Sequence, residues 1–446
     1  MTYPSHNQDA AFMPPQLYPV QTQKRTGVDP LLTFFLVALA FTGGWFANGI
    51  VNGPPATARP YSANIWQAWN DIDKNYVDKS AINHQKMDYA MITAMVDTLG
   101  DTGHSRFLSP ADVKAFNNQI NNQGTVGIGV YTSQLTTDKG NVVSINVVFP
   151  DSPAFKAGLL PGDQFYSVNG TNVIGKTIDQ VSPLIRGAAD TTVTVVVFRP
   201  NDGQQHSYTI TRAQVTPPLV TSLYFPTSHI GYVQILGFNS GVTVELTKQL
   251  KALQAQGMTS ILLDLRDNPG GLVDEAQGVL GDFLPTNSTA FLQKDSNGAK
   301  TSVKVKSGLD LAIPIAILVN GGTASAAEIT AGSIQDNRPG TQIIGQKTFG
   351  TDTVLIPFDL PDGSQLLLGV QQFLTPLGRQ FKPGVGLDPT QPIALPTNAT
   401  ALTPLVLQEL KLTEADVLSG KTTYNDTQLL AGIKTLQAAV TAKVAA

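Results

Sequence analysis

One serine occupies a position at which a nucleophile for acyl transfer could be held. Ser325 follows the apolar run 314–319 and a pair of glycines, and it lies at the start of a segment, 324–336, that we expect to be helical. The apolar run predicts a buried strand, and the glycines predict a tight turn. At such a corner the Ser325 hydroxyl would be exposed above the positive end of the helix dipole, where free N–H groups could bind an oxyanion. A serine that only caps the helix is the alternative interpretation.

The composition argues against several other kinds of chemistry. The 446 residues include no cysteine, which excludes thiol catalysis, disulfides and cysteine-ligated zinc. Only five histidines occur and no HExxH pattern is present, so we expect neither a metal nor an organic cofactor. A net charge of −4 without a basic block argues against nucleic acid as the main partner. The length of 446 residues predicts two or three domains, and the hydrophobic fraction of 42% predicts that most of the chain folds.

A long apolar segment near the N-terminus predicts a membrane anchor. Residues 30–58 contain no charged side chain, and we expect 30–51 to form a single transmembrane signal anchor. At 1.5 Å per residue a helix of this length can cross a bilayer. Residues 1–29 are rich in Pro, Gln and Asn, and we expect them to form a disordered cytoplasmic tail.

The charges that flank this segment predict its orientation. Lys24 and Arg25 precede it, whereas only Arg59 follows closely. This bias places the N-terminus in the cytoplasm and the rest of the chain outside it, at the cell membrane. A cleaved signal peptide is the alternative, because residues 56–58 read Ala-Thr-Ala, which resembles a cleavage site.

The hydrophobic periodicity changes several times along the remaining chain. A helical pattern covers 60–122, short β runs with turns cover 124–214, and strands alternate with helices from 219 to 395. This last order predicts βαβ crossover units in an α/β core. The tail 396–446 has a helical pattern and is expected to be peripheral.

Eight short segments occur in an order and spacing that point to one family. The segment around Ser325 reads Ala-Ser-Ala-Ala-Glu, and a preceding one reads Leu-Asp-Leu-Arg-Asp-Asn-Pro-Gly-Gly. Together they resemble the carboxyl-terminal processing peptidases, or tail-specific proteases, of the S41 serine peptidase family. The segments are 127–130, 152–163, 230–232, 263–271, 324–328, 335–336, 347–350 and 375–379.

The resemblance implies both a fold and an activity. It implies an α/β protease core of ββα type with crotonase-like crossover units at 219–395, an inserted PDZ domain at 124–214 and an N-terminal helical region. It also implies an endopeptidase that cleaves unfolded or C-terminally tagged proteins through an acyl-enzyme on Ser325. By the same resemblance, the N–H groups of Gly271 and Ala326 would bind the oxyanion.

The resemblance further implies how substrates would be recognised. The PDZ domain would capture polypeptides with apolar C-termini, and the peptide would add as a strand beside the helix expected at 177–186. The terminal carboxylate would bind N–H groups of the loop formed by Gly127, Ile128, Gly129 and Val130.

The chain departs from the family at the catalytic base. Thr351 stands where the family has a lysine, and threonine cannot accept a proton at neutral pH. Lys347 is one alternative base, although four residues of extended strand place it about 13 Å away. His104 is the base that we prefer, because the tricorn-like branch of the family uses a histidine from the N-terminal helical region. This would place the site closer to a subgroup without the usual lysine.

Two further interpretations concern the surroundings of the site. Glu328 and Asp336 are candidate supporting acids that could orient or pack it, and Ser105 or a carboxylate could orient the His104 ring. The alternative to an enzyme is a catalytically inactive pseudoprotease, in which the PDZ domain would hold peptides without cleaving them.

Overall fold

The computed structural model describes residues 59–101, 104–137, 140–200, 202–381, 385–396, 399, 401–420 and 425–445. The predicted cytoplasmic tail and the predicted span at 30–51 therefore lie outside the described residues. Within the described ranges, no helix is both long enough and apolar enough to cross a membrane. The chain divides into two compact units, with the boundary near residue 92.

The described part of the first unit, from residue 59 to 92, is helical. It contains α2 (Arg59–Asn75), the short 3-10 helix Lys79–Ala81 and the first part of α3 (His84–Asp97). The ring of Trp69 stacks on His84 at 5.4 Å, and His84 Nε2 lies 2.7 Å from a carboxylate oxygen of Asp73. The Trp66 side chain nevertheless stays 61% exposed, so α2 leaves a large aromatic side chain uncovered.

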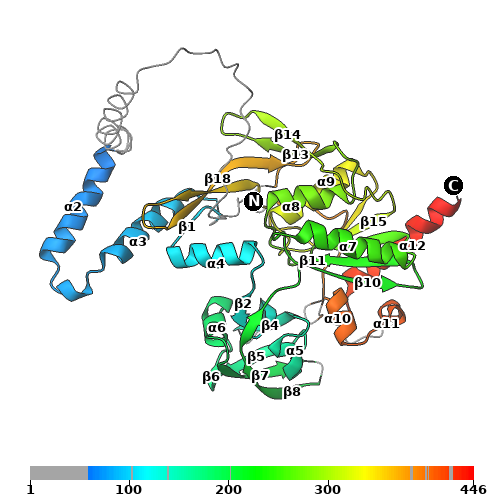
Figure 1. Cartoon of the computed structure of the whole chain (residues 1–446), viewed down its shortest axis with the longest axis horizontal. Helices are drawn as coiled ribbons and strands as arrows, with labels where there is room; N and C mark the ends of the chain where they lie inside the picture. The colour runs from blue at the N-terminus through cyan, green and yellow to red at the C-terminus, as the bar shows by residue number, and fades with distance from the viewer. Residues whose placement is uncertain are drawn as a thin grey trace, which may run out of the picture. The chain divides into compact units, whose positions relative to one another are not determined.

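The α/β core is built on a mixed six-stranded sheet (Figure 1). Adjacent strands from β11 to β19 run parallel to each other, and β10 is an edge strand that runs antiparallel to β11. Parallel neighbours need crossover connections, which here contain α7, α8 and α9. The strands are β10 (Val220–Phe225), β11 (Ile230–Ile235), β12 (Ser260–Asp264), β15 (Ile315–Val319), β16 (Gln342–Gly345) and β19 (Gln391–Pro392). The crossover helices are α7 (Val242–Ala255), α8 (Val273–Gly281) and α9 (Ala326–Asn337).

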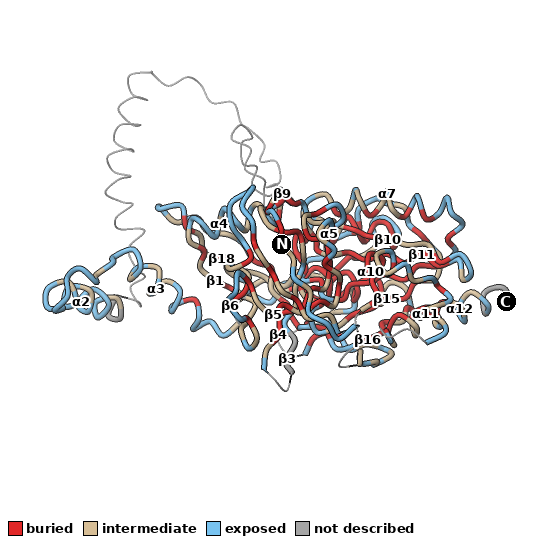
Figure 2. Tube along the Cα trace, turned by 90° about the horizontal axis from the view of Figure 1, so that it is seen from below, coloured by how far each residue is buried: buried red, intermediate tan, exposed pale blue. Residues whose placement is uncertain are grey.

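Both faces of this sheet are covered, as the alternation along β12 illustrates. Ile261 and Leu263 pack into the hydrophobic cluster shared with α7, α8 and α9, whereas Leu262 packs into a cluster on the opposite face. Successive side chains of a strand point to opposite faces, so a strand buried on both sides is apolar throughout. The buried segments run through the middle of the core in Figure 2.

The C-terminal helices cover the second face of the sheet, so the prediction of a peripheral tail was wrong. Leu429, Ile433 and Leu436 of α12 pack against strand residues and are at most 1% exposed. Each fully buried aliphatic side chain of this kind contributes about 1.5–3 kcal/mol to folding. The helices are α10 (Pro404–Glu409), α11 (Glu414–Ser419) and α12 (Thr427–Ala445).

A second sheet lies beside the core and receives a strand from the N-terminal region. Arg106 pairs with Leu367 in an antiparallel ladder, so the segment that contains His104 is anchored to β18. The strands are β1 (Arg106–Leu108), β18 (Gln365–Leu374), β13 (Thr289–Lys294), β14 (Lys300–Lys304) and β17 (Thr353–Asp359). Helix α4 (Pro110–Ile120) follows β1 and begins with a capping box formed by Ser109 and Asp112.

The β-rich module between α4 and β10 has its own hydrophobic core and a separate sheet. Two short strands, β2 (Thr125–Gly127) and β9 (Ala213–Val215), pair where the chain enters and leaves it. The sheet runs in the order β3-β4-β5-β7-β8, with β6 attached to β5. Its elements are β3 (Val130–Thr137), β4 (Gly140–Val148), α5 (Pro153–Ala157), β5 (Gln164–Val168), β6 (Thr171–Asn172), α6 (Ile178–Ile185), β7 (Thr192–Arg199) and β8 (Gln204–Thr211).

A carboxyl group lies where this module meets α10. Val147 and Phe149 of the module pack with Leu405 of α10, and Glu409 lies at the end of the same helix with one buried carboxylate oxygen unpartnered. Burial, with Asp163 nearby, raises the pKa of Glu409 to about 7. The folded state therefore favours the protonated side chain.

We expect this carboxyl group to make folding stability depend on pH. The folded pKa is raised from 4.5, so the stabilisation is complete below pH 4.5 and is lost as the pH rises to about 7. Glu409→Gln should flatten this part of the stability curve, because glutamine does not ionise. Chemical denaturation of both proteins at several pH values checks this, and parallel curves would contradict it.

Candidate active site

Ser325 lies at the corner between β15 and α9 in a strained backbone conformation. Its φ of 54° and ψ of −119° are rare for a residue other than glycine, and such a conformation costs about 1–3 kcal/mol. The side chain is buried, since the residue is only 2% exposed. Its Oγ has no hydrogen-bond partner. The prediction of an exposed hydroxyl was therefore wrong, and Ser325 does not act as a side-chain cap.

The reason for this burial is the loop that follows β12. A Cβ on Gly270 would lie 2.7 Å from the Ser325 Cβ and 2.9 Å from the Ala326 amide nitrogen, so only glycine fits between them. The Ala324 N–H donates to the Asn268 carbonyl at 2.9 Å, which ties the loop to the serine segment. The family resemblance implied that the two segments share one site, but a contact this close was not predicted.

The two predicted oxyanion residues belong to the segments that meet at this corner. Ala326 is the first residue of α9, so its N–H has no acceptor within the helix. Gly271 follows Gly270 with a φ of 144°, and a Cβ there would lie 2.4 Å from the Phe238 carbonyl oxygen. The loop therefore depends on glycine at two successive positions.

Glu328 holds the segment in which the family lysine would stand. Its buried carboxylate accepts hydrogen bonds from the N–H groups of Ser325, Gly350 and Thr351 at 2.9–3.0 Å, and from the Thr348 hydroxyl. Burial raises the pKa of Glu328, while these hydrogen bonds lower it in part. The amides of Ser325 and Thr351 bind the same carboxylate oxygen, so the position of the missing lysine lies next to the serine.

Replacement of this carboxylate is expected to destabilise the corner. In Glu328→Gln the amide NH2 would face backbone N–H groups, and a buried donor without an acceptor costs about 1–3 kcal/mol. We therefore expect a loss of at least that size in the free energy of unfolding, measured by chemical denaturation. Glu245→Gln, on the solvent side of α7, is the control, and an equal loss in both variants would contradict this role.

His104 is held near this segment by the second sheet. Its Nδ1 forms a hydrogen bond with the Thr353 hydroxyl, two residues beyond Thr351. The next residue, Ser105, accepts the Gly369 N–H at its hydroxyl, so the dipeptide is fixed on β17 and β18. Burial lowers the pKa of His104 to about 4, and the nearby charge of Asp101 opposes this shift. Thr353 is a partner that sequence analysis missed, and Ser105 holds a strand rather than the His104 ring.

The other predicted polar residues are engaged elsewhere. Lys347 lies 3.0 Å from Asp388 in an exposed ion pair, so it binds a surface carboxylate. Asp336 accepts the Leu377 N–H and pairs with Arg379, which fixes the turn after β18. Asp336 lies eleven positions beyond Ser325 along the helix, a rise of about 16 Å. Since the Ser325 hydroxyl has no hydrogen-bond partner, neither His104 nor Lys347 bonds to it here.

The predicted carboxylate loop lies at an open edge of the module sheet. Gly127 ends β2, and Val130 begins β3, which is the edge strand beside α6. The Ile128 carbonyl accepts the Ala154 N–H at 2.8 Å, and a Cβ on Gly129 would lie 2.3 Å from the Ser152 Cβ. An edge strand next to a helix can accept an added peptide strand.

Within the part of the chain that the structure describes, no cluster of three His, Asp or Glu side chains could hold a metal ion. The groups gathered at this corner are the serine, backbone N–H groups and the buried Glu328, and His104 binds Thr353 in the segment that follows Thr351. Such an arrangement suits acyl transfer, in which a nucleophile attacks a carbonyl and backbone N–H groups stabilise the oxyanion.

The chain is similar to two described families and to several known proteins. The family described as "Peptidase family S41" matches residues 229–393, and "PDZ domain" matches residues 144–199. The chain is 32% identical over 349 residues to a "Probable CtpA-like serine protease" of Staphylococcus haemolyticus, covering 78% of this chain and 67% of that protein. It is 31% identical over 353 residues to the "C-terminal processing peptidase, chloroplastic" of Tetradesmus obliquus, covering 74% of each.

A solved structure shows a similar fold. The structure of a putative S41 protease from Bacteroides fragilis matches with a TM-score of 0.55 and 20% sequence identity. The match covers 78% of this chain and 90% of that one. It supports the arrangement of the core and module described above.

Proposed function

Because this chain belongs to peptidase family S41 and is a serine peptidase of the carboxyl-terminal processing class, we propose that Ser325 is its nucleophile. One observation carries this proposal: Ser325 lies in a strained strand-to-helix corner directly against the glycine loop after β12. The hydroxyl would attack a peptide carbonyl and form an acyl-enzyme. The N–H groups of Gly271 and Ala326 would bind the oxyanion, each contributing about 3 kcal/mol to the transition state.

His104 is the proposed base of this reaction. Its Nδ1 is engaged by Thr353, which leaves Nε2 to accept the Ser325 proton and return it to the leaving amine. A pKa of about 4 keeps the ring neutral, and so able to accept a proton, throughout the physiological range. Since the Ser325 hydroxyl is unpartnered, the two side chains would come together only when substrate closes the site.

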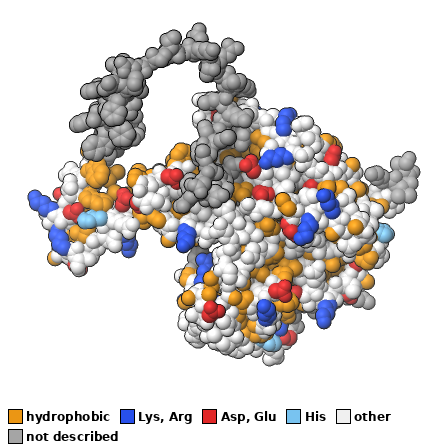
Figure 3. Space-filling view, viewed as in Figure 1, with side chains coloured by type: hydrophobic (Ala, Val, Ile, Leu, Met, Phe, Trp, Pro, Cys, Tyr) orange, Lys and Arg blue, Asp and Glu red, His pale blue; other side chains and the backbone are white. Residues whose placement is uncertain are grey.

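The proposed substrates are unfolded or C-terminally tagged polypeptides with apolar C-termini, bound first by the PDZ domain. The open edge of β3 beside α6 supports strand addition. Acidic and basic side chains are interspersed on the face shown in Figure 3, which suits a polypeptide better than a nucleic acid. We also propose that residues 30–51 anchor the enzyme in the cell membrane, with its catalytic part outside the cytoplasm.

A change in the peptide tests recognition of its terminal carboxylate. Amidation of the C-terminus removes the charge that the 127–130 loop would bind, so we expect the Kd to rise at least about tenfold, or 1.4 kcal/mol. Fluorescence anisotropy of a labelled peptide with an apolar C-terminus measures it. A peptide that differs only in having Asp as its C-terminal residue is the control for the apolar preference. Equal binding of the free and amidated forms would contradict this mode of capture.

The proposed activity is tested with the full chain and an unstructured peptide with an apolar C-terminus. Cleavage that depends on Ser325 would support it. Binding of the peptide without cleavage would instead indicate a PDZ scaffold that has lost its activity.

A further inference from the structure

A buried charge cluster joins the root of the oxyanion loop to the C-terminal helices. Arg266 follows β12 and directly precedes the loop 267–271, and its side chain is 1% exposed. Its guanidinium donates to Asp264 at 2.7–3.1 Å and to Asp426 at 2.9 Å. It also donates to the Tyr232 hydroxyl at 3.1 Å and to Gln428 Oε1 at 3.2 Å. The cluster therefore brings together groups from two strands of the sheet and from the C-terminal segment.

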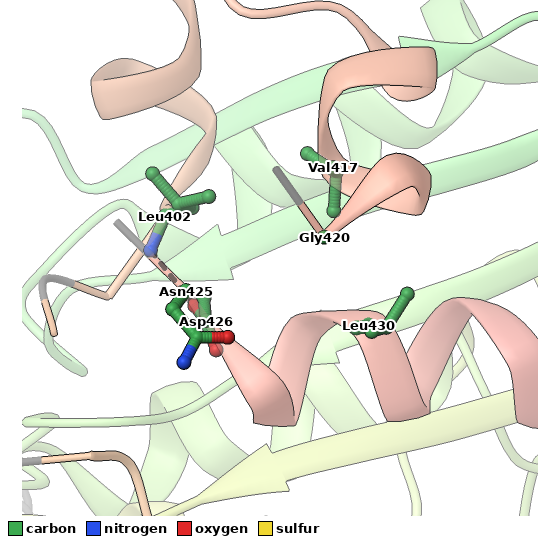
Figure 4. A pocket seen from close by; sticks show the side chains of 6 residues that line it. All are labelled: Leu402, Val417, Gly420, Asn425, Asp426 and Leu430. Carbon is green, nitrogen blue, oxygen red and sulfur yellow. Dashed lines mark hydrogen bonds between the residues drawn. The ribbon is translucent and has the colours of Figure 1, made fainter. Parts of the chain in front are cut away.

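Asp426 connects this cluster to α12. One carboxylate oxygen accepts the N–H groups of Gln428 and Leu429 at the helix start, at 3.1 and 2.9 Å. The other accepts the Leu402 N–H at 2.8 Å together with Arg266. Figure 4 shows Asp426 bonded to Leu402 at the start of α12, beside a small hollow also lined by Val417, Gly420, Asn425 and Leu430.

The charges in this cluster make its geometry specific. Two buried carboxylates surround one guanidinium, and the Tyr232 hydroxyl donates to Asp264 at 2.7 Å and lies 2.9 Å from the Leu402 carbonyl. Burial alone would lower the pKa of Arg266, but Asp264 and Asp426 raise it well above its usual value, so the guanidinium stays charged. A buried charge without its partner is strongly unfavourable, so Arg266 is held to the position that satisfies both carboxylates.

We propose that Asp426 is a positioning residue for catalysis: through Arg266 it fixes the loop that carries the oxyanion donor Gly271. This inference rests on the proposed function of that loop. The other side of the loop lies against Ser325, where Gly270 leaves no free space, so a small shift at Arg266 would change the spacing between nucleophile and oxyanion donor. Misplacement of this kind can slow a reaction far more than it weakens substrate binding.

Three variants of the full chain separate positioning from general stability. Asp426→Ala removes one of the two carboxylates that bind Arg266, whereas Asp426→Asn keeps a carbonyl oxygen at the same place. Glu414→Ala is the matched control, because Glu414 is also a buried carboxylate of the C-terminal segment. It accepts the Thr227 N–H at 2.9 Å, just before β11, at the end of the parallel sheet opposite to Arg266.

Steady-state cleavage and hydrogen–deuterium exchange of residues 267–272 are measured on each variant. Exchange reports on loop amides that are hydrogen-bonded here, such as Asn268, Gly270 and Leu272. For Asp426→Ala we expect kcat to fall roughly 10- to 100-fold with KM unchanged, and loop exchange to become faster. Asp426→Asn should give a kcat and a loop exchange rate between those of Asp426→Ala and wild type. If the alanine variant does not fold, the asparagine variant alone tests whether Asp426 positions the loop. Glu414→Ala should keep the wild-type kcat and loop exchange.

Wild-type kcat and loop exchange in Asp426→Ala would overturn the inference. So would an equal loss of kcat in Glu414→Ala, since the effect would then be general destabilisation. If the wild type itself cleaves no peptide, the proposed function fails, whereas the exchange comparison still decides whether Asp426 positions the loop.

Discussion

Ser325→Ala is expected to abolish peptide cleavage, with a fall in kcat of about 10⁶-fold, as when the serine of a catalytic unit is removed. The acyl-enzyme requires the Oγ that this substitution removes. Stability should be unchanged or slightly increased, because the wild-type hydroxyl is buried without a hydrogen-bond partner. Cleavage kinetics and chemical denaturation, measured side by side, check both parts.

Ser333→Ala is the matched control for this result. Ser333 lies two turns along the same helix, is fully buried, and donates to the Ala290 carbonyl. Its loss should therefore lower stability by about 1 kcal/mol while cleavage continues. Cleavage by Ser325→Ala at the wild-type rate would show that the reaction does not use this serine.

The second large effect is expected at His104. His104→Ala should reduce kcat by about 10²- to 10⁴-fold, the usual contribution of a general base. Because the pKa of His104 is lowered to about 4 by burial, wild-type kcat/KM should fall on the acid side near pH 4 rather than near 6.5. The remaining activity of the alanine variant should lack this acidic limb.

Lys347→Ala serves as the comparison, because this side chain pairs with Asp388 at the surface and should be dispensable. Activity that survives in His104→Ala but disappears in Lys347→Ala would overturn the assignment of the base. Thr353→Val is a further check. Loss of the Thr353 hydroxyl leaves His104 Nδ1 unpaired, which should change kcat without abolishing cleavage.

The features predictable from the sequence are those with a local signature. An apolar run, two glycines and a small helical segment were sufficient to place Ser325 on its corner, and the family resemblance is confirmed. The neighbouring glycine loop was likewise recognisable, because glycine is needed wherever a backbone approaches another segment closely.

Contacts between distant residues could not be derived in the same way. Thr353 is 249 residues from His104, and nothing in either segment identifies the other as its partner. The burial of Ser325 depends on how tightly Gly270 packs, which is a tertiary effect. The C-terminal helix was predicted as peripheral because its apolar residues suit either a surface or a covered face, and only the sheet distinguishes them.

The hydrogen bond between Arg266 and Asp426 joins residues that are 160 positions apart, and this separation has a consequence for biosynthesis. A ribosome reaches Asp426 about 100 residues after Ser325, which at 5–20 residues per second takes roughly 5–20 s. During that interval the nascent chain carries its nucleophile, but one face of its sheet is uncovered and the loop after β12 lacks its anchor. The active site would thus be fully assembled only after the C-terminal helices have been made.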